Sequence, residues 1–524
     1  MTLPPALRRR EALILGVITL TALALRVWAL GDAALLPDEG SSIFFSRLPL
    51  AVLLWDHCDP HPPGYYLLLR SVAALGQSEA WLRLPSALAG TLAVPLTWAT
   101  GRAAMRPTAQ TGQRWPDQAA LLAAALVAFA PLAVWYSREA RPYALLSLLT
   151  LAMAWAGLRW RQQPNALAAA AFLVAGWLAL WTEYGALVIL VGLNLFVLSG
   201  WPWRGENGSQ AASGRRWLAL QALLLAPFVL WWLLSAQRTA LAQMSYQAIF
   251  LAAQAQGLGL DWTPELASRV IMVTALAAGG LGLALALAVR RSERVRGWLG
   301  SPWAAAALLA LVAGLALLGA LPRLYTVKRH LNALLPFISI AAAWALLHRR
   351  SSTESMSVAR RMAAGGMAAM LLALTLATPM LAPEPAWREA VAALRKHGQA
   401  GDAIWVDELD APVFAYYWGE TGWDWQAASD DWRPLSARDL AALNAAPDRQ
   451  RVWLAGSFSP YRDLRRTLPE EFAHRRAPGQ SFTWHDVALT AYDASPALQP
   501  AAEAPLALRW GLRIQSPLDI SCRP

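Results

Sequence analysis

Charged residues and cysteines are both scarce in this chain. Asp, Glu, Lys and Arg make up 15% of the 524 residues, whereas hydrophobic residues make up 56%. A soluble protein of this length normally divides into several domains and carries about 25% charged residues, so the composition argues against that class. The two cysteines, Cys58 and Cys522, are too few for a disulfide framework or a zinc site. They are either two free thiols or one pair.

The hydrophobic residues are gathered into long runs with little charge. Runs of roughly 17–25 residues have the length needed to cross a hydrocarbon core about 30 Å thick. The first run is no cleaved signal peptide, because it ends with Arg26 and Trp28 instead of a small-residue cleavage site. We therefore expect a polytopic α-helical membrane protein with about 11 transmembrane helices, or up to about 13. The expected spans cover residues 11–30, 84–103, 118–135, 143–159, 165–181, 184–201, 216–235, 267–289, 302–321, 331–348 and 362–382.

The distribution of arginine predicts the orientation of these spans. Lys and Arg accumulate in short cytoplasmic loops, and one set of alternate loops is rich in Arg while the opposite set is poor in basic residues. The N-terminus is therefore expected in the cytoplasm, and an odd number of spans places the C-terminus outside. The formal net charge of +11 fits such loops and does not indicate nucleic acid. The arginine clusters lie at residues 8–10, 102–114, 159–161, 204–216, 290–296 and 349–361.

Two regions depart from this pattern of spans. Residues 61–80 are apolar but short, and a full crossing here would invert the charge pattern of every later loop, so we expect a juxtamembrane or re-entrant helix that starts at Pro62 and Pro63. After residue 383, WREAVAALRKHGQ predicts an amphipathic helix, and DAIWV, RVWLAG and DVALTAY predict short strands. The chain thus divides into a transmembrane domain over 1–382, with a large first outer loop over 31–83, and a small extracytoplasmic α/β domain over 383–524.

Ionisable residues gather in the loops expected on the outer side. The stretch LLPDEGSSIFFS places Asp38 and Glu39 directly after the first span, and charge near the membrane indicates a functional site. Each such residue has a structural alternative, because carboxylates cap helices and cations near helix ends reach towards the interface. The stretch DHCDPHPP has metal-ligand residue types without a zinc-type spacing, so a solvated loop is the alternative there. The remaining outer residues are Asp56, His57, Asp59, His61, Arg138, Glu139, Arg141, Glu183, Arg323, Lys328, Arg329 and His330.

The ordered combination of motifs resembles a known family. It consists of DEG after the first span, then HPPGYYLLLR, RLPSALAGTLAV, YSREARPYALL, and YTVKRHLNALLPF before a late span, followed by the outer C-terminal domain. This pattern extends over nearly the whole chain. It resembles the GT-C superfamily of membrane glycosyltransferases, specifically the glycosyltransferase family 39-like proteins, which include protein O-mannosyltransferases and the aminoarabinose transferases that modify lipid A.

The resemblance implies a glycosyltransferase of the bacterial plasma (inner) membrane. It would move a sugar from a polyprenyl-phosphate donor to a lipid, glycan or protein acceptor at the outer membrane face. Asp38 matches the acidic residue of the family's first loop, so it is the expected general base of an inverting displacement, and Glu39 would assist it. The leaving phosphate requires cations, for which the candidates are Arg138, Arg141, Lys328 and Arg329. The candidate substrate contacts are His61, Tyr65 and Glu183.

Metal dependence stays open at this stage. His61 stands where the aminoarabinose transferases carry a lysine. It could contact the donor phosphate, or it could ligate a divalent cation together with one of the first-loop carboxylates. The candidate metal ligands are Asp38, Glu39, His57 and His61.

The rival function is a transporter or flippase of lipid-linked glycans. Transporters commonly place polar groups within discontinuous mid-membrane helices, often in repeated halves. Here the spans are mostly free of charge, we find no internal repeat, and the polar residues gather on one side, which favours an enzyme. A polymerase that joins lipid-linked units would share the donor and is a third alternative.

Overall fold

The computed structural model divides the chain into two compact units, which are described separately. The first comprises residues 1–30, 61–235 and 273–380, and the second comprises 31–60, 236–272 and 381–524. Residues 31–60 of the expected first outer loop thus fall in the same unit as the C-terminal part. The structure describes residues 5–56, 61–105, 115–199, 208–236, 325–347, 386–407, 410–419, 425–428, 451–456, 476–484 and 487–493, together with positions 266, 269 and 473.

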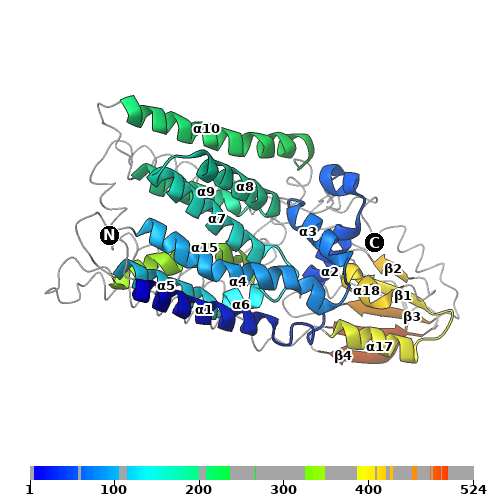
Figure 1. Cartoon of the computed structure of the whole chain (residues 1–524). Helices are drawn as coiled ribbons and strands as arrows, with labels where there is room; N and C mark the ends of the chain where they lie inside the picture. Colours follow the sequence, from blue (N-terminus) through cyan, green and yellow to red (C-terminus); the bar gives the residue numbers. More distant parts are fainter. Residues whose placement is uncertain are drawn as a thin grey trace. The chain divides into compact units, whose positions relative to one another are not determined.

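Long helices that lie side by side make up the described part of the first unit (Figure 1). The helix α4 contacts α1, α5 and α7, and α15 packs against α5 and α7. The helices are α1 (Pro5–Val27), α3 (Gly64–Ala73), α4 (Glu79–Ala104), α5 (Trp115–Phe129), α6 (Pro131–Tyr136), α7 (Tyr143–Gln162), α8 (Ala166–Thr182), α9 (Ala186–Ser199), α10 (Gly208–Trp231) with a π-helical turn at Trp232–Ala236, and α15 (Tyr325–Leu347).

Many large apolar side chains of these helices are exposed, and small residues contribute to the helix contacts. On α1, Leu13 and Leu20 are exposed by 69% and 67%, whereas Ala22 is buried against Val94 of α4 and Ala124 of α5. This inversion of the pattern of a water-soluble protein is typical of helices that lie in lipid and approach one another closely. In the part of the chain that the structure describes, two segments have both the length and the hydropathy of a full crossing, at Tyr143–Gln162 and Gly214–Leu234.

Each predicted span that falls in the described ranges coincides with a helix, with its ends shifted by several residues. One span differs in kind: residues 118–135 form two helices, α5 and α6, instead of one. The break lies at Ala130, because Pro131 has no N–H to bond within a continuing helix and instead occupies the first position of α6. The spans at 302–321 and 362–382, and 267–289 apart from position 269, lie outside the described residues, so the number of spans stays a prediction.

The HPPG segment begins a helix that is too short to cross a membrane. The helix α3 has 10 residues, which at 1.5 Å per residue is about half the thickness of a hydrocarbon core. This length agrees with the expectation that residues 61–80 do not form a full span. A Cβ built on Gly64 would lie 2.5 Å from the carbonyl oxygen of Trp181 in α8, so the glycine lets α3 start directly against α8.

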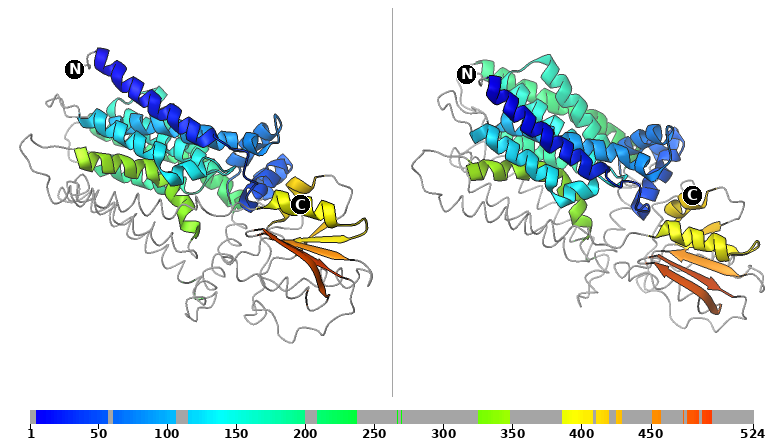
Figure 2. Two further views of the ribbon diagram at one scale, coloured as in Figure 1. Left: turned by 90° about the horizontal axis from the view of Figure 1, so that it is seen from below. Right: turned by 60° about the horizontal axis from the view of Figure 1, so that its bottom comes forward.

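In the residues that the structure describes, the second unit contains a five-stranded mixed sheet with the strand order β2-β1-β3-β5-β4. The central strand β3 is parallel to β1 and antiparallel to β5, while β1 is also parallel to β2 and β5 is also antiparallel to β4. Figure 2 shows α17 lying along the sheet. The elements are β1 (Ala403–Asp407), β2 (Trp425–Ala428), β3 (Val452–Gly456), β4 (Pro478–Trp484) and β5 (Val487–Tyr492), with helices α17 (Trp387–His397), α18 (Ala411–Trp418) and, from the first loop, α2 (Pro37–Arg47) and a π-helical turn at Val52–Asp56.

The predicted α/β character of the C-terminal region is observed, with additions. The expected helix and the three expected strands correspond to α17, β1, β3 and β5. Helix α18 was not predicted, because its sequence APVFAYYW is rich in the aromatic residues that favour strands. Strand β4 was not predicted because Pro478 and Gly479 open it, and these residues are typical of turns.

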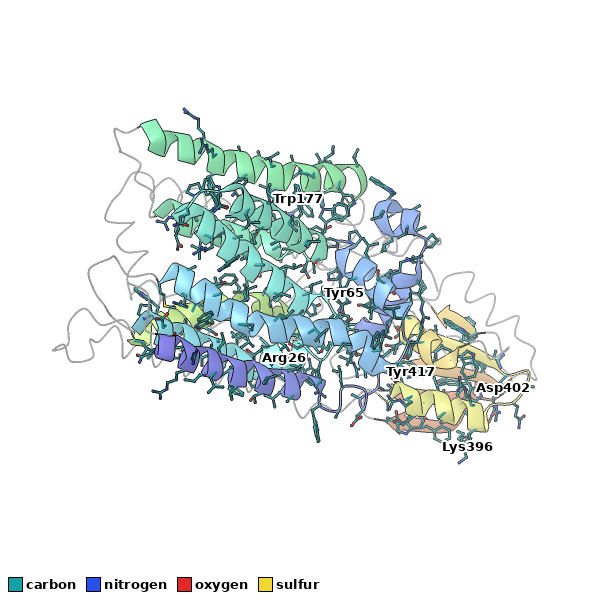
Figure 3. The ribbon with its side chains drawn as sticks, viewed as in Figure 1. Arg26, Tyr65, Trp177, Lys396, Asp402 and Tyr417 are labelled. Atoms are coloured by element: carbon teal, nitrogen blue, oxygen red, sulfur yellow. The ribbon has the colours of Figure 1, made fainter. Side chains whose placement is uncertain are left out.

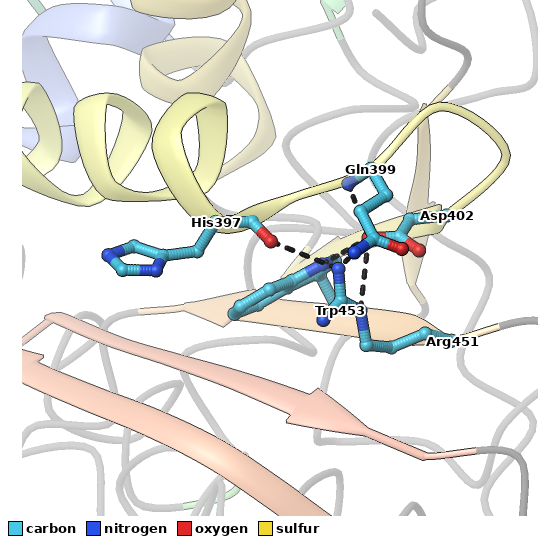
Figure 4. Close-up of polar contacts among 5 residues, drawn as sticks. All are labelled: His397, Gln399, Asp402, Arg451 and Trp453. Carbon is cyan, nitrogen blue, oxygen red and sulfur yellow. Dashed lines mark hydrogen bonds and ion pairs between the residues drawn. The ribbon is translucent and has the colours of Figure 1, made fainter.

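A single carboxylate ties α17 to the sheet (Figure 4). One oxygen of Asp402 accepts hydrogen bonds from Nε and Nη2 of Arg451, at 3.1 and 2.8 Å, and from Nε1 of Trp453 at 2.8 Å. The backbone N–H of Gln399 donates to the same oxygen, and Arg451 also donates to the carbonyl of His397 at the end of α17. Because the carboxylate is nearly buried, this network fixes the end of α17 over the start of β3.

Candidate functional site

Asp38 and Glu39 lie in the first turn of α2 but in different environments. Glu39 is fully buried, and its Oε2 accepts a hydrogen bond of 2.9 Å from the backbone N–H of Leu36, the residue that precedes the helix. Pro37 occupies the first helical position, where its missing N–H costs nothing. Glu39 therefore acts as the helix cap that was one alternative for this pair. Asp38 is exposed, so it is the carboxylate of the two that solvent can reach.

Arg141 is buried in the connection between α6 and α7, where it contacts Tyr143 of α7 and Ser86 of α4. Its Nη2 donates a 3.2 Å hydrogen bond to the hydroxyl of Tyr143, and its guanidinium lies 5.5 Å from the centre of the same ring. Its carbonyl accepts from Oγ of Ser86 at 3.0 Å, and the hydroxyl of Tyr65 lies 3.1 Å from that Oγ. Two of the predicted residues, Arg141 and Tyr65 (the latter labelled in Figure 3), are thus connected through one serine.

Arg138 belongs to the same connection but serves the end of α1. Its Nη1 donates to the carbonyls of Leu25 and Trp28, and its Nη2 donates to the carbonyl of Ala29 at 3.1 Å. The last carbonyls of a helix have no partner within the helix, and a cation there also meets the negative end of the helix dipole. The guanidinium of Arg138 is therefore engaged in capping α1.

Two further arginines, which were not among the predicted site residues, hold the same region. Arg26 is fully buried in α1 and donates to the carbonyls of Val127 and Ala128, where Pro131 ends α5, and to Oγ of Ser137 at 3.2 Å. Arg83 of α4 donates to the carbonyl of Leu30. The signal for Arg26 was its charge at the end of an apolar run, because such residues are costly to bury unless they are bonded.

His61 and Glu183 come together although they are far apart in sequence. Nε2 of His61 lies 3.9 Å from Oε2 of Glu183, which is buried at the end of α8. The other carboxylate oxygen of Glu183 accepts from the backbone N–H of Gly185 at 3.4 Å. The structure thus places two of the three predicted substrate contacts side by side at the start of α3, at the surface where Gly64 meets α8.

The remaining predicted residues are described only in part. Lys328 and Arg329 lie in the first turns of α15, and their side chains are outside the described residues, as is the whole of His57. In the described ranges, no group of three or more His, Cys, Asp or Glu residues is arranged to hold a metal ion. Asp38 and Glu39 are adjacent on a helix, where neighbouring side chains do not face each other, so these two alone do not form a divalent-cation site.

One family model matches part of the chain. Residues 58–201 match the model described as the N-terminal domain of the protein O-mannosyl-transferase TMEM260. This range contains the HPPGYY motif with Tyr65 and the YSREARPY motif with Arg141. It also contains Glu183. Over this range the match confirms the predicted resemblance to protein O-mannosyltransferases, and its description agrees with the prediction of a glycosyltransferase enzyme. No curated protein sequence matches the chain.

Several solved structures are similar to the chain at low sequence identity. An oligosaccharyltransferase, AglB from Archaeoglobus fulgidus in complex with an inhibitory peptide and a dolichol-phosphate, is 12% identical, with 94% of this chain and 75% of AglB covered and a TM-score of 0.47. ArnT from Cupriavidus metallidurans is 15% identical, with 94% of this chain and 100% of ArnT covered and a TM-score of 0.44. The arabinosyltransferase EmbB from Mycobacterium smegmatis is 17% identical, with 72% of this chain and 42% of EmbB covered and a TM-score of 0.33.

Proposed function

We propose that the chain transfers a sugar from a polyprenyl-phosphate donor to an acceptor hydroxyl of a lipid, glycan or protein at the outer face of the membrane. The observation that carries this proposal is the family match over residues 58–201. The matched range includes Tyr65, Ser86 and Arg141, which are connected by hydrogen bonds. A description as a protein O-mannosyl-transferase makes a mannosyl donor and a protein hydroxyl the first pair to assay.

The reaction is a displacement at the anomeric carbon of the sugar. The acceptor oxygen forms a bond to that carbon, while the bond from the carbon to the phosphate oxygen breaks on the opposite side, so the configuration inverts. The acceptor proton moves to a carboxylate, and Asp38 takes this role because it is exposed at the first turn of α2. Polyprenyl phosphate leaves with the bonding electrons and needs cationic stabilisation.

Arg141 is the first candidate for stabilising that phosphate. Arginine binds phosphate through a planar fork of donors and keeps its charge even when it is buried. Of the other predicted cations, Arg138 already donates to carbonyls of α1, so we assign it to holding α1 in place. Lys328 and Arg329 remain proposals from the sequence. His61, Tyr65 and Glu183 would contact the substrate around the start of α3.

The location of the protein follows from the same proposal. We expect an integral protein of a bacterial plasma membrane, with a cytoplasmic N-terminus and an extracytoplasmic C-terminal domain, as the arginine distribution indicates. The first unit, with its exposed Leu and Val side chains and small-residue contacts, suits the lipid environment that this requires.

The test is release of polyprenyl phosphate by the protein in nanodiscs. A panel of polyprenyl-phosphate sugars is supplied with membrane lipid extract or a Ser/Thr peptide as acceptor, and turnover is compared between wild type and Asp38→Asn. Asp32→Asn is the matched control, because Asp32 is another exposed carboxylate just before α2. Turnover that is lost with Asp38→Asn and kept with Asp32→Asn supports the proposal.

Two other outcomes would contradict parts of it. Full turnover by Asp38→Asn removes Asp38 from the role of base while keeping the enzyme. Absence of turnover by the wild type with every donor and acceptor, together with movement of a fluorescent lipid-linked glycan across the bilayer, would favour the flippase alternative. Repetition of the active assay with EDTA, followed by Mg²⁺ or Mn²⁺, tests whether a divalent cation is required.

A further inference from the structure

The loop that leads into α2 is held by a helix that lies more than half the chain away. Arg388 of α17 donates from Nη1 to the carbonyl of Asp32 at 3.1 Å and from Nη2 to the carbonyl of Gly31 at 3.4 Å. Both of these carbonyls precede the Asp-Glu pair by a few residues. One side chain of the C-terminal region therefore fixes the start of the acidic segment.

A second contact holds the chain two positions before the helix. The backbone N–H of Leu35 donates a 2.7 Å hydrogen bond to the hydroxyl of Tyr417 on α18, and Tyr417 is labelled in Figure 3. Leu35 is fully buried, so this N–H could not find water if the tyrosine hydroxyl were removed. A buried donor left without a partner is costly, which makes this hydrogen bond a strong constraint on the position of the segment.

The third contact is a direct approach of α2 to α18. A Cβ built on Gly40 would lie 2.6 Å from N, Cα and Cβ of Val413, and two of these atoms belong to the backbone. The glycine of the DEG motif is therefore the residue that allows the two helices to touch. Any other side chain at this position would push the helices apart, because backbone atoms cannot rotate away.

The three contacts lie on both sides of Asp38. Arg388 and Tyr417 anchor the segment before it, and Val413 meets the residue two positions after it. The internal cap by Glu39 fixes the turn between them. Asp38 is thus exposed on a helix that is itself tightly held, which is the arrangement expected for a group that must meet a reacting atom within a few tenths of an ångström.

We infer that Tyr417 and Gly40 are positioning residues for Asp38, and that the C-terminal α/β domain sets the placement of the catalytic carboxylate through α17 and α18. This inference rests on the proposed role of Asp38 as general base. It assigns to the C-terminal domain a part in the chemical step itself, in addition to any part in acceptor selection.

The experiment measures kcat and donor KM for four proteins in nanodiscs: wild type, Tyr417→Phe, Gly40→Ala and the double variant. We expect each single change to lower kcat by about tenfold, with the donor KM changed less than about twofold, because the carboxylate is displaced while the donor site is intact. The kcat of the double variant should fall by less than the product of the two single-variant factors, because both changes release the same helix. Gly192→Ala is the control, since nothing lies within 4 Å of a Cβ at that position of α9.

The rate of amide hydrogen exchange in α2 measures how firmly this helix is held in the same four proteins. Faster exchange in α2 together with lower kcat supports the inference. Faster exchange with unchanged kcat overturns it, and so does a kcat loss that is fully multiplicative or that is accompanied by a matching rise in donor KM. If the wild type transfers no sugar or Asp38→Asn keeps full turnover, the proposed base fails and the inference falls with it. A kcat effect confined to Asp38→Asn overturns the inference alone.

Discussion

The hydroxyl of Tyr65 lies 3.1 Å from Oγ of Ser86, and through this serine the HPPG helix is connected to the backbone of Arg141. All three residues are buried. A polar chain of this kind is stable only when each member keeps its partner. It therefore couples the position of α3 to the position of the arginine that is proposed to hold the donor phosphate.

We predict that Tyr65→Phe and Ser86→Ala both raise the donor KM by about threefold to tenfold, with the larger increase for Ser86→Ala and a smaller change in kcat. Tyr65→Phe removes one hydrogen bond of roughly 1 kcal/mol from the chain, whereas Ser86→Ala removes two, and the guanidinium of Arg141 is then less firmly placed. Ser71→Ala is the control, because Ser71 is an exposed serine of α3 whose hydroxyl bonds the carbonyl of Leu67 in its own helix. An unchanged donor KM in either variant would show that the chain does not position Arg141.

Arg141→Gln should raise the donor KM by at least about tenfold, and Arg141→Lys should be intermediate. The glutamine has no charge to pair with the phosphate, while the lysine keeps the charge and loses the planar fork. Isothermal titration with polyprenyl phosphate alone gives the same ranking without turnover. Arg159→Gln, near the other end of α7, is the matched control. Equal affinity of the wild type and Arg141→Gln for polyprenyl phosphate would remove Arg141 from the phosphate site.

Arg138→Gln should lower thermal stability and leave the donor KM nearly unchanged. The substitution removes three hydrogen bonds from a cationic donor to the end of α1, and the loss should amount to about 1–3 kcal/mol after allowance for partial exposure. A thermal shift assay in detergent measures the stability, and the nanodisc assay measures KM. A variant with unchanged melting temperature and a much higher donor KM would show that Arg138 binds the donor phosphate.

Asp402→Ala should destabilise the C-terminal domain by about 1–3 kcal/mol, because it leaves the partly buried guanidinium of Arg451 and the N–H of Trp453 without this acceptor. Hydrogen exchange along α17 and β3 should accelerate, while exchange in α7 and α8 stays the same. The exposed carboxylate of Asp493 provides the control as Asp493→Ala. Unchanged exchange in β3 would show that the carboxylate contributes little to this part of the fold.

Tyr492 should ionise at a higher pH than an ordinary tyrosine. Burial in the sheet raises the pKa of Tyr492 from its ordinary value near 10 to about 12. Below pH 10 both the folded and the unfolded chain keep this proton, so stability is unaffected. As the pH rises from 10 to 12, the unfolded chain loses the proton first and the domain loses stability. The difference in tyrosinate absorbance between wild type and Tyr492→Phe reports this titration, and a midpoint near 10 would contradict the prediction.

Much of the helical architecture could be predicted from the sequence, because a crossing segment must be long and apolar. The α5–α6 break was missed, since a hydropathy window averages over Pro131 and does not register the loss of one N–H. The C-terminal strands β1, β3 and β5 were recognised by their alternating or continuous apolar residues. Helix α18 was not, because its helical state depends on packing against α2 and the sheet more than on its aromatic sequence.

The candidate site was only partly predictable, for a different reason. The sequence showed which residues were costly to place near a membrane, and these included Glu39, Arg138 and Arg141. It did not show that Glu39 caps α2 or that Arg138 caps α1, because both roles depend on the direction of a side chain towards particular backbone groups. The pairing of His61 with Glu183 depends likewise on how α3 meets α8, which no local pattern encodes.

The contact between α18 and α2 determines when the acidic segment can fold during synthesis. Leu35 and Tyr417, which share a hydrogen bond, are separated by 382 positions. A ribosome delivers the acidic segment early, and the tyrosine that fixes it emerges only after the intervening helices have been inserted. The proposed carboxylate is therefore fixed in place only after residue 417 has been synthesised. Partly synthesised or truncated chains would bind membranes without acquiring an ordered catalytic group.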